Sequence, residues 1–302
     1  MEAIHAPTAA RSFLRSPRFA DMLLVCVAVV WGSSYGVAKG ALAYYPVIGF
    51  LAVRFCLTFV LLAPVWFRRS WRSIVATWRV GAPLGLILFA IFVCETFGVA
   101  MTRASNAAFL ISLCVVFTPF VEAVVFRVRP ATSAIIAAGV SAVGALLLTA
   151  DVDIDLNLGD GLMLVAAVLR ACMVVVTKRL TDKTNIDSLS LTASQSGMVA
   201  LGSLGLVIAL PGSAGKLPDA PGFWLSALFL VLFCTIFAFF AQNYAVRRTS
   251  PTRVSLLMGS EPVFGALFAR VWLGDHLTAS AWVGGSLIVS AALWATLRPS
   301  KP

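Results

Sequence analysis

Six ionisable residues fall inside long apolar stretches of this 302-residue sequence. They are three arginines and three glutamates: Arg54, Glu95, Glu122, Arg170, Glu261 and Arg270. A charged side chain that faces lipid at the centre of a bilayer costs about 2.5 to 3.5 kcal/mol or more, so each should face a partner, a cavity or an interface. An arginine held in such a place offers the fixed positive charge that a bound carboxylate needs.

The four deeper charges form two pairs when their positions along the chain are converted to depth. At a rise of about 1.5 Å per residue, Arg54 and Glu95 both lie roughly 10 Å below the predicted outer boundary of the membrane. By the same measure, Arg170 and Glu261 both lie roughly 12 Å above the inner boundary. Each pair is a candidate for binding substrate and equally a candidate for a structural ion pair between helices. The two remaining charges lie near stretch ends, from which long side chains reach water.

The first apolar stretch is polar near its centre, where it holds Trp31, Ser34 and Tyr35. Trp31 and Tyr35 are four residues apart and therefore share one face of a helix, where they are predicted to line a cavity with Ser34. Gly32 and Gly36 form a small-xxx-small step, which lets a second helix approach closely. The stretch is thus a candidate for both substrate binding and helix packing.

Five polar residues and two prolines complete the candidate residues. The polar ones, further candidates for substrate binding, are Gln195, Thr235, Gln242, Asn243 and Tyr244. Amides and hydroxyls inside apolar helices also serve as hydrogen bonds between helices. Pro119 and Pro262 each remove one backbone hydrogen bond, so they are predicted to kink their helices. Such kinks serve either as hinges near a site or as structural features alone.

Ten apolar stretches of about 20 residues must position these side chains. Hydrophobic residues make up 60% of the chain and charged residues only 12%, and the mean hydropathy is +0.95. About 20 apolar residues cross a bilayer core about 30 Å thick, so the sequence predicts an all-α integral membrane protein with ten transmembrane helices. Little chain remains for a soluble catalytic domain, and an enzyme is not expected. The predicted spans are 20–39, 47–67, 81–101, 105–126, 131–150, 159–177, 188–210, 222–245, 253–273 and 279–297.

The basic residues predict the orientation in the membrane. With the N-terminus inside, the outer segments hold only Lys39, Arg103 and Lys216, whereas most of the 23 lysines and arginines lie in inner segments. This positive-inside bias predicts a multi-pass protein of a bacterial inner membrane with both termini in the cytoplasm, residues 1–19 forming a cytoplasmic tail. The net charge of +10 is therefore read as topological, and nucleic acid is not an expected partner.

No metal site and no cofactor are expected. The six cysteines all lie inside predicted spans, far from the two histidines, and are predicted to be core residues. The acidic loop at residues 151–157 begins like a calcium-binding EF-hand loop, but Leu156 and Leu162 stand where that motif needs glycine and glutamate. A solvated outer loop is the simpler interpretation.

The chain contains an internal duplication. Residues 103–105 read RAS and residues 248–250 read RTS, each before a predicted span, and residues 23–39 resemble residues 162–178. Five spans per copy force the second copy to insert upside down, which gives an inverted-topology repeat. Two such halves can enclose a central cavity and open it alternately to either side. The predicted five-helix units are residues 20–150 and 159–297.

The two repeats, the WGSSY of residues 31–35, Arg54, and Glu261-Pro262 followed by LGDHL at residues 273–277 resemble the drug/metabolite transporter superfamily, EamA type. Nearly the whole chain takes part in this resemblance. It is most similar to bacterial amino-acid exporters, including those for aromatic amino acids. One departure is Asp275, where the family more often has glutamate. The resemblance implies ten helices around a central cavity and export of small zwitterions or metabolites by alternating access.

We therefore expect a secondary transporter that exports amino acids, aromatic or other apolar ones among them, from the cytoplasm. The alternative within this class is an exporter of drugs, nucleosides or other small metabolites. A membrane-embedded enzyme would need large loops with metal-binding motifs, which are missing from the sequence, and a passive channel would show conductance in place of saturable exchange. Transport is either coupled to protons through Glu95 or Glu261 or facilitated, and no nucleotide-binding motif points to ATP. The expected partners are the substrate and membrane lipid, and the oligomeric state stays unknown.

Overall fold

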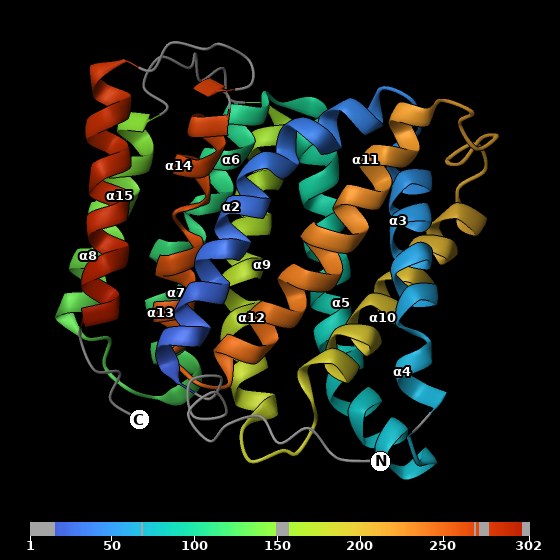
Figure 1. Cartoon of the computed structure of the whole chain (residues 1–302), viewed down its shortest axis with the longest axis horizontal. Helices are drawn as coiled ribbons and strands as arrows, with labels where there is room; N and C mark the ends of the chain where they lie inside the picture. The colour runs from blue at the N-terminus through green and yellow to red at the C-terminus, as the bar shows by residue number, and fades with distance from the viewer. Residues whose placement is uncertain (1–15, 68, 149–156, 269, 272–277, 298–302) are drawn as a thin grey trace, which may run out of the picture.

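A computed structural model describes residues 16–67, 69–148, 157–268, 270–271 and 278–297, and all the regular elements in these ranges are helices (Figure 1). Most of the N-terminal tail, the acidic loop at residues 151–156 and the LGDHL segment lie outside the described residues. The first half of the chain forms α2 (Pro17–Leu42), α3 (Val47–Leu62), α4 (Pro64–Phe67), α5 (Trp71–Met101), α6 (Ala104–Ser112), α7 (Cys114–Phe126) and α8 (Thr132–Leu148). The second half forms α9 (Leu158–Thr181), α10 (Ser188–Ala209), α11 (Pro221–Val231), the π-helix η1 (Leu232–Phe237), α12 (Ala238–Val246), α13 (Pro251–Met258), α14 (Glu261–Phe268) and α15 (Ala279–Leu297).

Eight helical segments in the described ranges are long and apolar enough to cross a membrane, which makes this a multi-pass membrane protein. Two of the ten predicted spans are not among these eight segments. The span predicted at 131–150 is α8, an apolar helix of 17 residues, at the lower limit for crossing a bilayer. The span predicted as one helix at 253–273 is two short helices, α13 and α14. The kink predicted at Pro262 is in the structure a break between two helices, which lies directly before this proline.

The breaks in the helices interrupt hydrophobic segments near the middle of the bundle. α6 gives way to α7 at Leu113, and α13 gives way to α14 at Gly259 and Ser260. Pro262 lies in the first turn of α14, directly after its break, where a proline costs no hydrogen bond. Pro119 lies inside α7 instead, beyond the break at Leu113. The two prolines therefore have different positions relative to the breaks in their helices.

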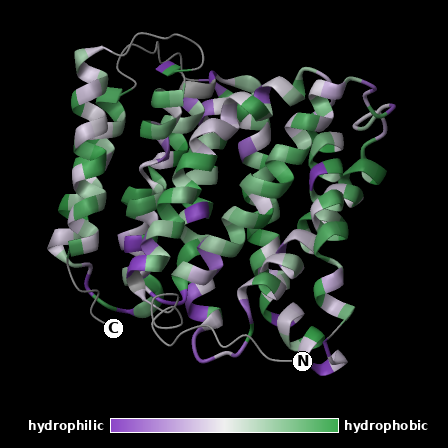
Figure 2. Ribbon diagram, viewed as in Figure 1, coloured by the Kyte–Doolittle hydropathy of each residue, from purple (hydrophilic) through white to green (hydrophobic). Residues whose placement is uncertain are grey.

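The helices pack side by side in a single bundle (Figure 1). α8 packs along α15 at one end of the view, and α3 packs along α10 at the other. Between these pairs, α2 contacts α12, α13 and α14, while α5 contacts α9 and α10. Figure 2 shows hydrophobic residues along the middle of the bundle and many of the hydrophilic ones toward its two ends. This distribution fits a protein whose mid-section faces lipid.

Glycines allow two of these helix pairs to approach closely. A Cβ atom on Gly32 of α2 would lie only 2.6 Å from the carbonyl oxygen of Glu261 at the start of α14. A Cβ atom on Gly144 of α8 would lie 2.7 Å from the carbonyl oxygen of Gly284 in α15. Gly36, the other glycine of the predicted small-xxx-small step, has open space beside it. Only Gly32 therefore supports close packing of α2.

Two lysines make similar contacts at opposite ends of the bundle. Lys39, in the last turn of α2, donates a hydrogen bond to the backbone oxygen of Thr102 at the end of α5. Lys178, in the last turn of α9, donates to the backbone oxygen of Arg247 at the end of α12. A cation at a helix C-terminus stabilises the unpaired carbonyl groups there. On the Lys39 side, Asp160 of α9 also accepts a 2.6 Å hydrogen bond from the Thr102 hydroxyl.

A largely buried ion pair connects three helices at the end of the bundle where α12 leads into α13, which is called the arginine-rich end because Arg247, Arg248 and Arg253 lie there. Arg253 of α13 approaches Asp21 of α2 to 2.5 Å, and a second bond between the same side chains measures 3.0 Å. Arg253 also donates to the backbone oxygen of Thr296 in α15 at 3.1 Å. Bidentate pairs of this kind fix geometry as well as charge.

Candidate functional site

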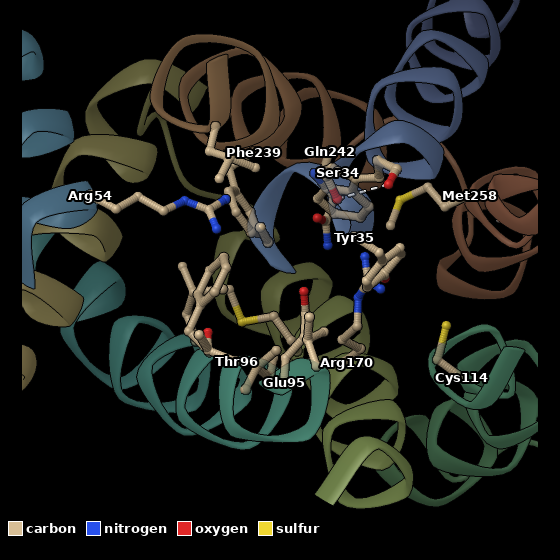
Figure 3. A pocket seen from close by; sticks show the side chains of 18 of the residues that line it. Ser34, Tyr35, Arg54, Glu95, Thr96, Cys114, Arg170, Phe239, Gln242 and Met258 are labelled. Atoms are coloured by element: carbon tan, nitrogen blue, oxygen red, sulfur yellow. Dashed lines mark hydrogen bonds between the residues drawn. The ribbon is translucent and has the colours of Figure 1, made fainter. Parts of the chain in front are cut away.

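A small cavity in the middle of the bundle contains most of the predicted site residues (Figure 3). Its walls come from α2, α3, α5, α7, α9, α11, α12 and α13, so both halves of the chain contribute. Its volume is about 40 Å³, which holds only a few water molecules. Seven of the predicted substrate-binding residues line it: Trp31, Ser34, Tyr35, Arg54, Glu95, Arg170 and Gln242.

Arg54 reaches the cavity from α3 and is fixed through only one of its nitrogens. Its Nε donates to the hydroxyl of Thr235 at 3.1 Å, and that hydroxyl donates in turn to the carbonyl oxygen of Leu230 at 2.8 Å across the π-helix. The guanidinium carbon lies 4.8 Å from the centre of the Phe92 ring, within cation–π range. Among the described residues, no carboxylate lies within ion-pair distance of Arg54 and no acceptor binds its terminal nitrogens. Arg54 thus presents free donors to the cavity.

Glu95 reaches the same cavity from α5, on the wall across from Arg54 (Figure 3). Within the described part of the chain it forms no ion pair and no side-chain hydrogen bond. Arg54 and Glu95 therefore share the cavity, as their equal depth predicted, without forming the direct ion pair that was the structural alternative. Three charged side chains line the cavity: Arg170, which is paired with Glu261, and Arg54 and Glu95, which have no ion-pair partner among the described residues.

Arg170 and Glu261 do form an ion pair beside the cavity. Arg170 Nη1 lies 3.6 Å from Glu261 Oε2, and both side chains are almost fully buried. The guanidinium also stacks over the Trp31 ring at 4.3 Å. Glu261 Oε1 is buried with no hydrogen-bond partner, and the Tyr35 side chain neighbours this carboxylate. Glu261 supports the cavity wall through Arg170 but does not itself line the cavity.

Aromatic rings form the remaining walls. The Trp31 indole donates a 2.9 Å hydrogen bond to the carbonyl oxygen of Cys234 in η1, which fixes the ring. Trp31 packs on Phe239 at 5.6 Å between ring centres, and Phe239 packs on Phe92 at 5.9 Å. The three rings therefore form a continuous row of contacts from the Arg54 guanidinium, which lies over Phe92, to the Arg170 guanidinium, which lies over Trp31.

Gln195 and Asn243 are not brought to the cavity. Both are buried, and the Asn243 amide donates to Gln195 at 2.8 Å and to the Thr192 hydroxyl at 3.0 Å. These hydrogen bonds connect α10 to α12. The two amides therefore have the structural role that was the alternative to substrate binding. The next residue, Gln242, lines the cavity instead, because successive residues of a helix point about 100° apart.

Sequence reasoning missed several lining residues. Phe92 and Phe239 give no signal, since they are apolar residues in apolar spans. Thr96 follows Glu95 directly but carries no charge to single it out. In the described ranges, no group of three or more histidine, cysteine, aspartate and glutamate side chains is placed to hold a metal ion.

The sequence matches a known family over nearly its full length. The model of the EamA-like transporter family matches residues 18–150 and again residues 157–297. Three proteins of Archaeoglobus fulgidus, each described only as an uncharacterized transporter, are similar. The first is 25% identical, over 93% of this chain and 86% of its own. The others are 23% identical, over 89% and 95%, and 24% identical, over 92% and 97%.

A solved structure described only as a crystal structure of a protein has a similar fold. It superposes with a TM-score of 0.73 and covers 93% of this chain and 98% of its own. The sequence identity is 16%, so this likeness extends to the fold alone.

Proposed function

The chain belongs to the EamA-like transporter family, and from this premise we propose that it exports amino acids, aromatic or other apolar ones among them, through the central cavity. The observation that carries the proposal is the free cation of Arg54 opposite the free anion of Glu95. An amino acid carries one carboxylate and one ammonium group, which match these two charges. Arg170 also lines the described cavity, but its charge is already paired with Glu261.

The energetics of burial support this assignment. A buried charge is costly unless it is paired and hydrogen-bonded, and a membrane interior makes it more so. Arg54 meets this need in part through Thr235 and Phe92, but its terminal nitrogens still require an acceptor. A carboxylate suits them because guanidinium and carboxylate form two parallel hydrogen bonds.

The aromatic walls favour an apolar side chain on the transported molecule. Phe92, Phe239 and Trp31 line the same cavity as the two charges and contact one another, and aromatic rings pack well on other rings in offset or edge-to-face geometry. A nucleoside or a drug would also stack there. It would leave one or both of the charges unpaired, which is why we prefer the zwitterion.

We further propose that the cavity opens alternately to the two sides, through inverted five-helix units at residues 20–150 and 159–297. Two observations support this symmetry. The lysines at corresponding positions of the two units, Lys39 and Lys178, cap helix C-termini at opposite ends of the bundle. The corresponding spans are both broken, at Leu113 and at Gly259. A cavity of about 40 Å³ is too small for an amino acid and belongs to a closed state of this cycle.

Orientation follows the charge distribution. We propose a bacterial inner-membrane protein with both termini in the cytoplasm, since arginines gather at the end of the bundle where α12 leads into α13.

The test is export by purified protein in liposomes loaded with a panel of labelled amino acids, nucleosides and cationic drugs. We expect saturable export of apolar amino acids, and its loss in an Arg54→Ala variant. Replacement of exposed Arg79 of α5 by alanine is the matched control and should leave export intact. Export of nucleosides or drugs but of no amino acid would support the alternative substrate class.

A further inference from the structure

A second and larger cavity lies at the arginine-rich end of the bundle, between α7, α8, α13 and α15. Its volume is about 510 Å³, which falls in the range of ligand-binding pockets. The central cavity, by contrast, has room for only a few water molecules. The charge distribution predicts that this end faces the cytoplasm. We call this space the entry chamber.

The entry chamber carries both signs of charge. Glu122 of α7 lines it, and one of its carboxylate oxygens, Oε2, accepts bonds from the backbone and hydroxyl of Thr252. The other oxygen, Oε1, makes no bond to the described residues. Arg129, in the segment that joins α7 to α8, is exposed and also lines the chamber. Trp294 of α15 adds an aromatic wall. A cation, an anion and an aromatic ring are the same three features as in the central cavity.

The two cavities are lined by nearby residues of the same two helices, α7 and α13, which contact each other. The Thr118 hydroxyl of α7 donates to the Ser255 hydroxyl of α13 at 2.9 Å. Ser255 lines the central cavity, whereas its neighbour Leu256 lines the entry chamber. On α7, Cys114 likewise faces the centre and Pro119 the chamber.

We propose that the entry chamber is a second binding site for the transported amino acid, occupied before the molecule passes between α7 and α13 into the central cavity. The inference rests on the proposed amino-acid export. It assigns the carboxylate of the amino acid to Arg129, its ammonium group to Glu122, and its apolar side chain to Trp294. It also makes the α7–α13 crossing the inner barrier of the route.

The first experiment fills the chamber. Ala134 of α8 lines it, and Ala134→Trp places an indole there. Ile136, on the same helix, is 46% exposed on the outside of the bundle, and Ile136→Trp is the matched control. We expect Ala134→Trp to slow export from liposomes at least tenfold and to leave equilibrium binding of the labelled amino acid at the Arg54 site of the detergent-purified protein unchanged. Ile136→Trp should export at the wild-type rate.

The second experiment closes the barrier reversibly. Cys114 Sγ lies 3.8 Å from Ser255 Oγ, so Ser255→Cys places two thiols close enough to form a disulfide after a small rotation. Oxidation of this variant should stop export, and reduction should restore it. A Cys114→Ser/Ser255→Cys variant cannot form the bond, so its export should not respond to oxidation.

The outcomes separate the two proposals. If Ala134→Trp exports at the wild-type rate, the chamber lies off the route, as it would if a lipid chain filled it, and the inference falls. Unimpaired export by the cross-linked variant would also overturn it. If wild-type protein binds and exports no amino acid, the proposed function fails before either variant is made.

Discussion

Replacing Gly32 with alanine tests whether the contact between α2 and α14 positions the cavity. The added Cβ would lie 2.6 Å from the Glu261 carbonyl oxygen and 2.7 Å from the Gly265 nitrogen, whereas ordinary contact begins at 3.4 Å. The helices must therefore separate by about 0.8 Å, the difference between 3.4 and 2.6 Å. Both obstructing atoms belong to the backbone, so no side-chain rotation relieves the clash. Overpacking of this kind costs about 1–3 kcal/mol.

The separation also moves Glu261 away from Arg170. Their ion pair already measures 3.6 Å, and a further shift of about 0.8 Å lowers its Coulomb energy by roughly a fifth, since that energy falls as the inverse of the distance. We expect Gly32→Ala to lower the unfolding temperature in detergent and to reduce export in liposomes. Gly36→Ala, one turn along the same helix with open space beside it, should match wild type in both assays. Equal behaviour of the two variants would refute the packing argument.

Two further predictions concern single contacts. Trp31→Phe keeps an aromatic ring but removes the bond to the Cys234 carbonyl oxygen, so we expect a loss of about 1–3 kcal/mol in stability, and an unchanged unfolding temperature in detergent would contradict this role. Partial burial of Asp187 opposes its ionisation, but hydrogen bonds from Ser190 and the charge of Arg69 outweigh it and hold the pKa of Asp187 below its ordinary value of 3.8. Because the folded pKa is the lower one, the stabilisation is complete above about pH 4 and is lost as the pH falls through the folded pKa. Thermal unfolding from pH 3 to 7 should show this loss in wild type and not in Asp187→Asn.

The long helices follow from hydropathy, because lipid requires an apolar residue at nearly every position of a span. Hydropathy does not report backbone breaks, which depend on packing. The break before Pro262 had a local signal, since a proline cannot continue the hydrogen-bond ladder. The break at Leu113 had none, and Pro119, which looked equivalent, lies inside a continuous helix.

The depth argument found residues that meet in the bundle but did not give their arrangement. A constant rise per residue puts Arg54 level with Glu95 and Arg170 level with Glu261 as two separate pairs, whereas in the structure Arg54, Glu95 and Arg170 all line one cavity. Which way a side chain points depends on the partners of its helix. Gln195 does not line the cavity, because the face of α10 that carries it packs against α12.

The most direct test of the central claim compares a transported amino acid with two analogues, its amide and the acid that lacks the amino group. Charge-assisted hydrogen bonds contribute about 1.5–3 kcal/mol, or roughly 10- to 150-fold in affinity. Binding to purified wild-type protein should weaken by that factor for each analogue. Arg54→Ala should no longer distinguish the amide, and Glu95→Gln should no longer distinguish the acid. Equal affinity of wild-type protein for all three compounds would contradict the claim that Arg54 and Glu95 hold a zwitterion between them.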